Sequence, residues 1–272
     1  MIRRPPRSTL DRSSAASDVY KRQVVMGVAN DRSIAWGIAN KLIDEGYTCI
    51  FTYPNDSIKK RITRLSPMAH TIKCDVSNSM DVRNAFIEAT QHYPKIDYVV
   101  HAMSMTDFRE LDGKMMDISR DNFLESLEVG CYSLIDVVRN SLENMNEGGS
   151  YLTLSYDGAR RVYDNYNVMG VVKAGLESTT RYLAKDCAEK GVRINCISAG
   201  VIKTSSAMAV KGSKGMLKWA EGVNPMKRNI TLQDLAGSAY YFLSDLSSGV
   251  TGETHYVDCG YNIIGAPSID DI

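Results

Sequence analysis

Short apolar runs rich in β-branched residues alternate along the chain with longer segments in which apolar residues recur at i, i+3 and i+4. The short runs predict strands, and the periodic segments predict amphipathic helices. We expect strands at 24–27, 47–53, 70–75, 96–103, 150–156, 192–198 and 254–260. We expect helices at 34–45, 57–65, 79–92, 119–144, 166–189 and 231–245.

This alternation is the layout of βαβ units around a parallel sheet. No linker, repeat or low-complexity segment interrupts the chain after residue 23. We therefore predict an α/β fold with a single domain at 24–266, a short tail at 267–272, and a Rossmann-like, doubly wound parallel sheet of seven strands with helices on both faces. Functional residues of such sheets collect at the carboxyl ends of the strands, where the strand order reverses.

The first 23 residues, MIRRPPRSTLDRSSAASDVYKRQ, are basic, rich in Ser and Arg, and without apolar periodicity. This composition is typical of a disordered tail. In addition, DVYKRQ is the translation of a DNA string that resembles a transposon-end sequencing adapter. We expect residues 1–23 to be a non-native or disordered extension, joined to a chain that has lost its own first residues.

Composition argues against several classes of partner. Lys and Arg together number 32, as do Asp and Glu, so the net charge of zero gives no reason to expect a nucleic acid or a membrane surface. No apolar run reaches the roughly 18 residues of a membrane span. The six cysteines lie far apart, without a C-x-x-C pair or a Cys/His cluster at metal-ligand spacing. We expect a cytoplasmic protein without a metal site.

A dinucleotide site is expected at the ends of strands one, three and four. GVANDRSIAWG follows the first strand, with Gly27 at its start and Ser33 and Ile34 where the next helix begins, so unpaired N–H groups face a potential pyrophosphate. This is not the G-x-G-x-x-G pattern, and a structural turn explains the glycines as well. Asp75 and Val76 end the third strand, although Asp75 is equally suited to cap the following helix.

The segment after the second strand bears on the choice of cofactor. An acidic side chain there would bind a ribose 2′-hydroxyl, and a basic one a 2′-phosphate. Pro54 and Asn55 follow Tyr53 directly, with Lys59, Lys60 and Arg61 on the next helix. We expect NADH rather than NADPH.

Three tyrosines and one lysine lie between residues 155 and 175. Tyr166 and Lys173 are seven positions apart, within about 20° of one helix face, so both can address one bound molecule. Beside a dinucleotide, Lys173 would bind ribose hydroxyls and lower the pKa of a nearby phenol. If the helix is considered alone, an exposed surface lysine remains an alternative. Tyr163 falls in the preceding loop and is expected only to pack. Tyr156 ends the fifth strand and is placed to line a pocket.

Several motifs together carry a resemblance to a known family. LTLSY, YNVMGVVKAGLES, GVRINCISAG, SDLSSGVTGETHYVDCG and GVANDRSIAWG, spread over about residues 22 to 266, resemble the divergent branch of the short-chain dehydrogenase/reductases. That branch holds the NADH-dependent enoyl-acyl-carrier-protein reductases of bacterial fatty-acid synthesis. It has Tyr-x6-Lys where its carbonyl-reducing relatives have Tyr-x3-Lys, and no tyrosine here has a lysine four residues on.

The resemblance implies roles for individual residues. Tyr166 would bind the thioester carbonyl of a trans-2-enoyl substrate, Lys173 the cofactor ribose, and Tyr156 would line the pocket as a second tyrosine. The cofactor contacts implied are Gly27, Ser33, Ile34, Asp75, Val76, Met103, Lys173, Ile202 and Thr204. The substrate contacts implied are Ala102, Ser104, Tyr156, Tyr166, Met208 and Met216. The two methionines lie in an implied mobile loop at about 204–220, although a helix packing on the core would show the same residues. Ser104 and Val201 depart from the family, which has glycine and proline there.

The resemblance further implies an acyl carrier protein as partner, a homotetramer and a cytoplasmic location. A basic stretch at 203–228 suits an acidic carrier, although a merely solvated face has the same composition. Two alternatives remain open at this point. One is a short-chain dehydrogenase/reductase acting on a carbonyl, and the other is a nucleotide-sensing protein without catalysis.

Overall fold

The computed structural model describes residues 21–266, so the expected extension up to residue 20 and the tail at 267–272 lie outside the described residues. Seven parallel strands form one sheet in the order β3-β2-β1-β4-β5-β6-β7, which confirms the predicted fold class. The strands are β1 Arg22–Met26, β2 Thr48–Tyr53, β3 His70–Lys73, β4 Ile96–His101, β5 Met145–Ser155, β6 Arg193–Ala199 and β7 Thr254–Val257.

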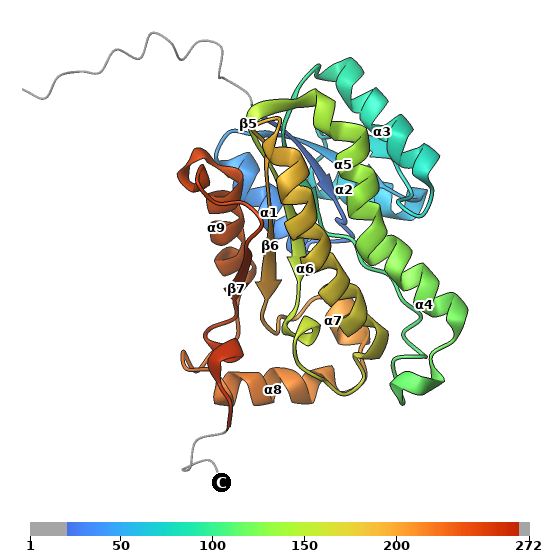
Figure 1. The fold of residues 1–272 in the computed structure, drawn as a ribbon, viewed down its shortest axis with the longest axis vertical. Coiled ribbons are helices and arrows are strands. Elements are labelled where there is room, and N and C mark those ends of the chain that lie inside the picture. The colour runs from blue at the N-terminus through green and yellow to red at the C-terminus, as the bar shows by residue number, and fades with distance from the viewer. Residues whose placement is uncertain (1–20, 267–272) are drawn as a thin grey trace, which may run out of the picture.

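Helices cover both faces of this sheet (Figure 1). They are α1 Ile34–Asp44, α2 Asp56–Leu65, α3 Ser79–His92, α4 Arg120–Leu127, α5 Ser133–Ser141, α6 Asn167–Ala188, α7 Ser205–Ala209, α8 Ser213–Val223 and α9 Leu232–Leu243. Successive strand residues face opposite layers, as Val24 and Val25 of β1 do. Val24 packs in the core under α3, α5 and α6, whereas Val25 packs in the core under α1, α2 and α9.

The first strand begins two residues before the expected position. Gln23 belongs to β1, where it pairs with Cys49 of β2 and with Tyr98 of β4. Its side chain is fully buried and its Oε1 accepts a bond from Cys49 Sγ at 3.3 Å. A polar residue at this position broke the apolar run that we used to place the strand.

The helix expected at 119–144 is interrupted. A π-helical turn at Glu128–Tyr132 separates α4 from α5. Gly130 lies in this turn against α6, and a Cβ at that position would meet Val172 Cγ1 at 2.4 Å. The glycine lets the turn approach α6 closely, a tertiary cause that periodicity does not reveal.

The segment expected to be a mobile loop forms two helices, α7 and α8. Thr204 caps α7 by accepting a bond from Ala207 N at 3.1 Å. Gly212 precedes α8 with a φ of +82°, which allows the chain to turn between the two helices. Figure 1 shows both helices beyond the carboxyl ends of the strands, on the side where a site is expected. Among the described residues, no helix is long and apolar enough to cross a membrane.

Candidate active site

A cavity of about 550 Å³ lies between the carboxyl ends of the strands and helices α7 and α8. Residues from segments far apart in the sequence line it, and almost all of the predicted site residues are among them. These are Gly27, Ser33, Ile34, Ala102, Met103, Ser104, Tyr156, Tyr166, Lys173, Ile202, Thr204 and Met216. The cavity meets the sheet where the order reverses between β1 and β4, the usual ligand position in open α/β sheets.

The loop after β1 forms one wall of this cavity. Gly27 has a φ of +94°, and a Cβ there would meet the Ala102 carbonyl oxygen at 2.1 Å, so only glycine fits. Ser33 precedes α1, and its Oγ accepts bonds from Ala29 N and Asn30 N, both at 3.0 Å. These bonds fold the loop so that the N-terminus of α1, with its partial positive charge, faces the cavity.

The same loop contacts the helices that cover the cavity. Asn30 Nδ2 donates a hydrogen bond of 2.9 Å to Ser205 Oγ, the first residue of α7. On α8, Met216 and Leu217 face the cavity, whereas Lys214 and Lys218 are exposed to solvent. The covering helices thus present an apolar inner side and a basic outer side.

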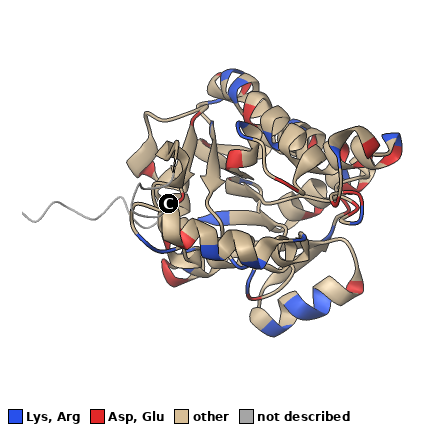
Figure 2. Cartoon of the chain, turned by 90° about the horizontal axis from the view of Figure 1, so that it is seen from below, with Lys and Arg blue, Asp and Glu red and all other residues tan. Residues whose placement is uncertain are grey.

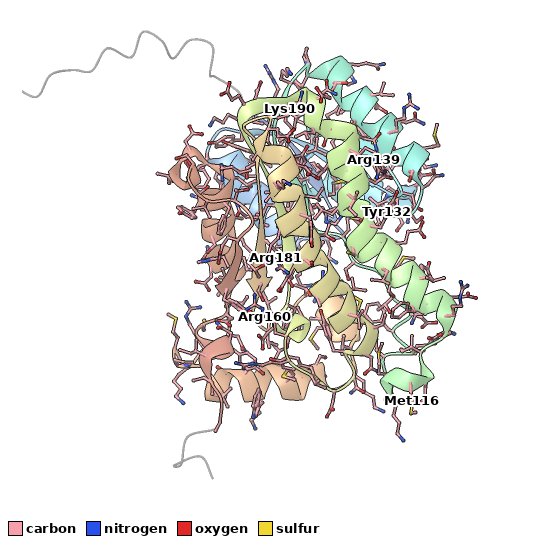
Figure 3. All side chains as sticks on the ribbon, in the orientation of Figure 1. Met116, Tyr132, Arg139, Arg160, Arg181 and Lys190 are labelled. Carbon is pink, nitrogen blue, oxygen red and sulfur yellow. The ribbon has the colours of Figure 1, made fainter. Side chains whose placement is uncertain are left out.

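Lys173 lies on α6 with its side chain buried against the end of β5. Its Nζ donates a bond of 2.9 Å to the Leu154 carbonyl oxygen, and burial lowers its pKa. Glu177, one turn further along α6, accepts a bond from Ser155 Oγ at 2.7 Å and pairs with Arg160 at 3.4 Å. Arg160 lies beside α6 in Figure 3. Lys173 is therefore a buried cavity residue, and the alternative of a surface lysine is wrong.

Tyr166 immediately precedes α6, between two asparagines in left-handed backbone conformations. Asn165 has a φ of 60° and Asn167 a φ of 35°, a region that asparagine tolerates better than most residues. Asn167 Nδ2 holds this geometry by donating to the carbonyl oxygens of Leu111 and Gly113, at 3.1 and 3.2 Å. The Tyr166 hydroxyl makes no hydrogen bond within residues 21–266, so it is available to a ligand. Sequence reasoning missed the two asparagines, although the pattern N-Y-N was a usable signal.

The pKa of Tyr166 differs from the expectation. We expected Lys173 to lower the pKa of a nearby phenol, but the pKa of Tyr166 is raised, because burial disfavours the phenolate. The Lys173 ammonium is instead directed at the Leu154 carbonyl. Tyr166 therefore remains a neutral phenol at physiological pH, with a proton that its hydroxyl can donate.

Tyr156 and Tyr163 pack beside Tyr166. The Tyr156 ring lies 5.0 Å from the Tyr166 ring in an edge arrangement and 5.1 Å from the Tyr163 ring. As expected, Tyr163 packs, but it also lines the cavity and donates a 2.5 Å bond to the buried Asp157 Oδ2. A Cβ at Gly158 would meet the Tyr166 ring at 2.5 Å, so this glycine makes room for the ring.

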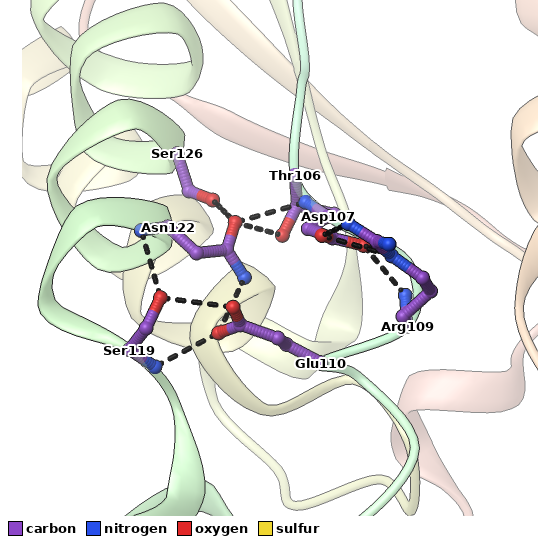
Figure 4. A network of polar contacts seen from close by, with 7 residues as sticks. All are labelled: Thr106, Asp107, Arg109, Glu110, Ser119, Asn122 and Ser126. Carbon is purple, nitrogen blue, oxygen red and sulfur yellow. Dashed lines mark hydrogen bonds and ion pairs between the residues drawn. The ribbon is translucent and has the colours of Figure 1, made fainter.

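The loop after β4 is fixed by a polar network centred on the buried Asn122 of α4 (Figure 4). Asn122 Oδ1 accepts bonds from Thr106 Oγ1 at 3.1 Å, Asp107 N at 2.9 Å and Ser126 Oγ at 3.2 Å. Its Nδ2 donates to Glu110 Oε2 at 3.3 Å. The network joins α4 to the loop that carries Ser104 and the apolar lining residues after Ser104. The sequence alone did not predict this network.

Three predicted contacts do not line the cavity. Asp75 is exposed and its Oδ1 accepts bonds from Ser77 N and Oγ, while Val76 is buried in the core. The cap of α3 is Asn78, so the alternative of Asp75 as the cap of that helix is wrong, while the cofactor contacts of Asp75 and Val76 stay predictions. Met208 points toward Ser213, whose Oγ lies 4.0 Å from its sulfur. Met208 lies on α7 and does not line the cavity, whereas Met216 of α8 does.

The basic stretch at 203–228 is partly neutralised. Lys211 pairs with Asp112 at 2.7 Å, and Arg228 pairs with Asp234 at 2.7 Å. Figure 2 views the molecule from below, the side on which α8 lies in Figure 1, with Lys and Arg blue and Asp and Glu red along the ribbon. Lys214 and Lys218 carry the charge of the exposed side of α8.

Comparison with known proteins identifies the family. The family profile described as "Enoyl-(Acyl carrier protein) reductase" matches residues 27–262. The chain is 43% identical to "Enoyl-[acyl-carrier-protein] reductase [NADH] 2" of Rhizobium meliloti, over 92% of this chain and 94% of that protein. It is 41% identical to "Enoyl-[acyl-carrier-protein] reductase [NADH] FabI" of Bacillus cereus, over 90% and 98%.

Solved structures agree with this result. The enoyl-acyl-carrier-protein reductase of Aquifex aeolicus superposes with a TM-score of 0.88 at 39% identity, covering 90% of this chain and 98% of that one. That of Anaplasma phagocytophilum, in complex with NAD, superposes with a TM-score of 0.87 at 42% identity, covering 92% and 95%. The chain belongs to the enoyl-acyl-carrier-protein reductase family.

Proposed function

We propose that the protein reduces trans-2-enoyl thioesters, carried on acyl carrier protein, to acyl thioesters with NADH, as a step of bacterial type II fatty-acid synthesis. The observation that carries this proposal is the unpaired Tyr166 hydroxyl in an apolar cavity, beside Lys173 and opposite the N-terminus of α1. Relatives named as NADH-dependent enoyl-acyl-carrier-protein reductases support it.

The residues fit a dinucleotide. The absence of a side chain at Gly27 and the free N–H groups at the start of α1 suit a pyrophosphate, and Lys173 lies within the cavity to meet ribose hydroxyls. When bound, the nicotinamide supplies a hydride to the β-carbon of the enoyl group. NADH is the form named for the relatives, and Pro54 and Asn55 place no cation directly after β2.

Tyr166 has the central role in this mechanism. As the β-carbon is reduced, negative charge develops on the thioester oxygen, and the neutral phenol would donate a hydrogen bond to it. A proton from solvent, added at the α-carbon of this enolate, would complete the acyl thioester. Such donors, aimed at a developing oxyanion, contribute about 3 to 4 kcal/mol. Tyr156 packs on the Tyr166 ring and fixes its direction. Because the pKa of Tyr166 is raised, the phenol keeps its proton while it stabilises this charge.

The test is the loss of NADH absorbance on mixing the protein with crotonyl thioester, run beside a ketone substrate. We expect oxidation of NADH with the enoyl thioester only. Turnover of the ketone alone would identify a carbonyl reductase, and NADH binding without turnover of either would identify a nucleotide sensor.

Charge supports acyl carrier protein as the carrier, because Lys214 and Lys218 face outward beside the cavity. Reversing both charges should lower kcat/KM for carrier-bound substrate about tenfold at low salt and leave a coenzyme A thioester unaffected. Lys95→Glu, an exposed lysine directly before β4 at the amino end of the strands and so away from the cavity, is the control. Equal effects on both substrates would contradict a carrier-docking role.

Assembly and location complete the proposal. The described cysteines are all free thiols, which supports a reducing compartment, and we assign the protein to the cytoplasm. We also propose a homotetramer. Light scattering coupled to size-exclusion chromatography tests it, and a mass near the 30.1 kDa of one chain would contradict it.

A further inference from the structure

Three potential metal ligands gather at the edge of the sheet remote from the cavity. His70 begins β3, while Glu88 and His92 lie near the end of α3. One ligand atom of each lies within 4.8 Å of the others. None of the three lines the cavity, and Figure 1 shows α3 and the covering helix α8 at opposite ends of the molecule.

We propose that His70, Glu88 and His92 form a binding site for a divalent transition-metal ion, and that Zn²⁺ is the ion that it fits. Two imidazole nitrogens and one carboxylate oxygen are ligands that zinc prefers. Three protein ligands leave the fourth tetrahedral position to water, so the site is open to solvent. This proposal is independent of the reductase activity.

The spacing of the three residues brings their side chains to one point. Glu88 and His92 are four residues apart on α3, which places them on the same helix face. His70 Nε2 lies 3.8 Å from Glu88 Oε1. Two ligands of one tetrahedral zinc ion lie about 3.4 Å apart, given bond lengths near 2.0–2.2 Å. The exposed Glu88 and His92 side chains can close the remaining gaps of at most about 1.4 Å by rotation.

The surroundings of the ligands also favour a cation. His70 Nε2 is shielded from solvent and has no hydrogen-bond partner among the described residues, so coordination would satisfy a polar atom that is otherwise unpaired. His92 is the last residue of α3. Unpaired carbonyl groups at a helix C-terminus carry a partial negative charge, which stabilises a positive ion there.

Sequence reasoning predicted no metal site because it looked for Cys and His at the spacing of known motifs. Glu88 and His92 have a usable spacing, but the third ligand comes from a strand that precedes α3. Only the packing of α3 against β3 brings His70 beside them. The proposal therefore revises that expectation.

The experiment is a calorimetric titration of the metal-free, full-length protein with Zn²⁺, which measures stoichiometry and Kd. Thermal unfolding with and without Zn²⁺ then measures the change in stability. We expect one ion per chain, and about 5 °C of added thermal stability at a free Zn²⁺ concentration about 100 times Kd. His92→Ala and Glu88→Gln should each weaken binding at least about tenfold, since each removes one ligand. His255→Ala removes an exposed histidine elsewhere and is the matched control. NADH oxidation by the metal-free variants should equal that of the wild type.

Several results would overturn the proposal. These are the absence of saturable binding in the wild type, unchanged affinity in His92→Ala, and an equal loss in His255→Ala. Replacing zinc by Co²⁺ gives an independent readout, because thiolate ligands add charge-transfer bands to the cobalt spectrum. Such bands would assign the ion to cysteine instead of His70, Glu88 and His92.

Discussion

At Tyr166 the backbone aims one phenol into the cavity, with left-handed asparagines on both sides. Tyr166→Phe should lower kcat about 10- to 1000-fold with little change in NADH affinity, because it removes only the donor to the developing oxyanion. Steady-state kinetics and fluorescence titration with NADH measure the two quantities.

Tyr163→Phe is the matched control, since it keeps the ring that packs on Tyr156. It removes the hydrogen bond to the buried Asp157, which retains Arg161 as a partner at 3.6 Å. We expect a loss of about 1 to 2 kcal/mol in stability with kcat nearly unchanged. A larger fall in kcat for Tyr163→Phe than for Tyr166→Phe would show that the roles were assigned to the wrong tyrosine.

Lys173 offers a second test at this scale. Lys173→Met keeps an apolar stem of similar length in the buried position and removes the charged donor. The Kd for NADH should rise about 10- to 100-fold, since hydrogen bonds from charged groups are typically worth about 1.5 to 3 kcal/mol. If fluorescence titration gives the wild-type Kd, Lys173 does not bind the ribose.

At the scale of the elements, the network around Asn122 joins α4 to the loop after β4. Asn122→Ala removes an acceptor for three donors and should destabilise the protein by about 2 to 3 kcal/mol. It should also raise KM for the enoyl substrate, because Ser104 lies on the same loop. Urea unfolding measures the loss of stability. Ser126→Ala is the control, because it removes one donor to Asn122 and should cost about 1 kcal/mol or less. Equal losses in the two variants would contradict a central role for Asn122.

Elements were predictable where their cause is local. The seven strands follow from apolar runs, and the predicted helices from their periodicity. The break between α4 and α5 was missed because its cause is the contact of Gly130 with α6. For 204–220 the sequence leaves a mobile loop and a packed helix open, because Gly and Ser lower its helix propensity. A cap at Thr204 and burial of Met216 and Leu217 favour the helices α7 and α8.

The candidate site was predictable at the carboxyl ends of the strands. Gly27, Tyr166 and Lys173 converge because parallel strands bring those ends together. The direction of the Tyr166 pKa and the network at Asn122 were not predictable, because both depend on which groups become buried together.

At the scale of the whole molecule, His101 couples stability to pH. It is buried between Thr153 and Ser133, and burial lowers its pKa to about 3. Between that value and the pKa of about 6.5 expected after unfolding, only the unfolded chain binds the proton. Stability should therefore fall with decreasing pH, by about 1.4 kcal/mol per unit from this residue. Urea unfolding at several pH values should show a shallower slope for His101→Gln, and an unchanged slope would contradict this linkage.

The hydrogen bond from Asn30 to Ser205 bears on the order in which cofactor and substrate bind. It joins the dinucleotide loop to the helices that carry the acyl-facing side of the cavity. A dinucleotide bound beneath that junction is enclosed once the acyl chain occupies the space against α8. We therefore expect NADH to bind before the enoyl thioester, and NAD⁺ to dissociate after the acyl product. In product inhibition, NAD⁺ should then compete with NADH and not with the enoyl thioester, whereas competition with both would mean that the two substrates enter independently.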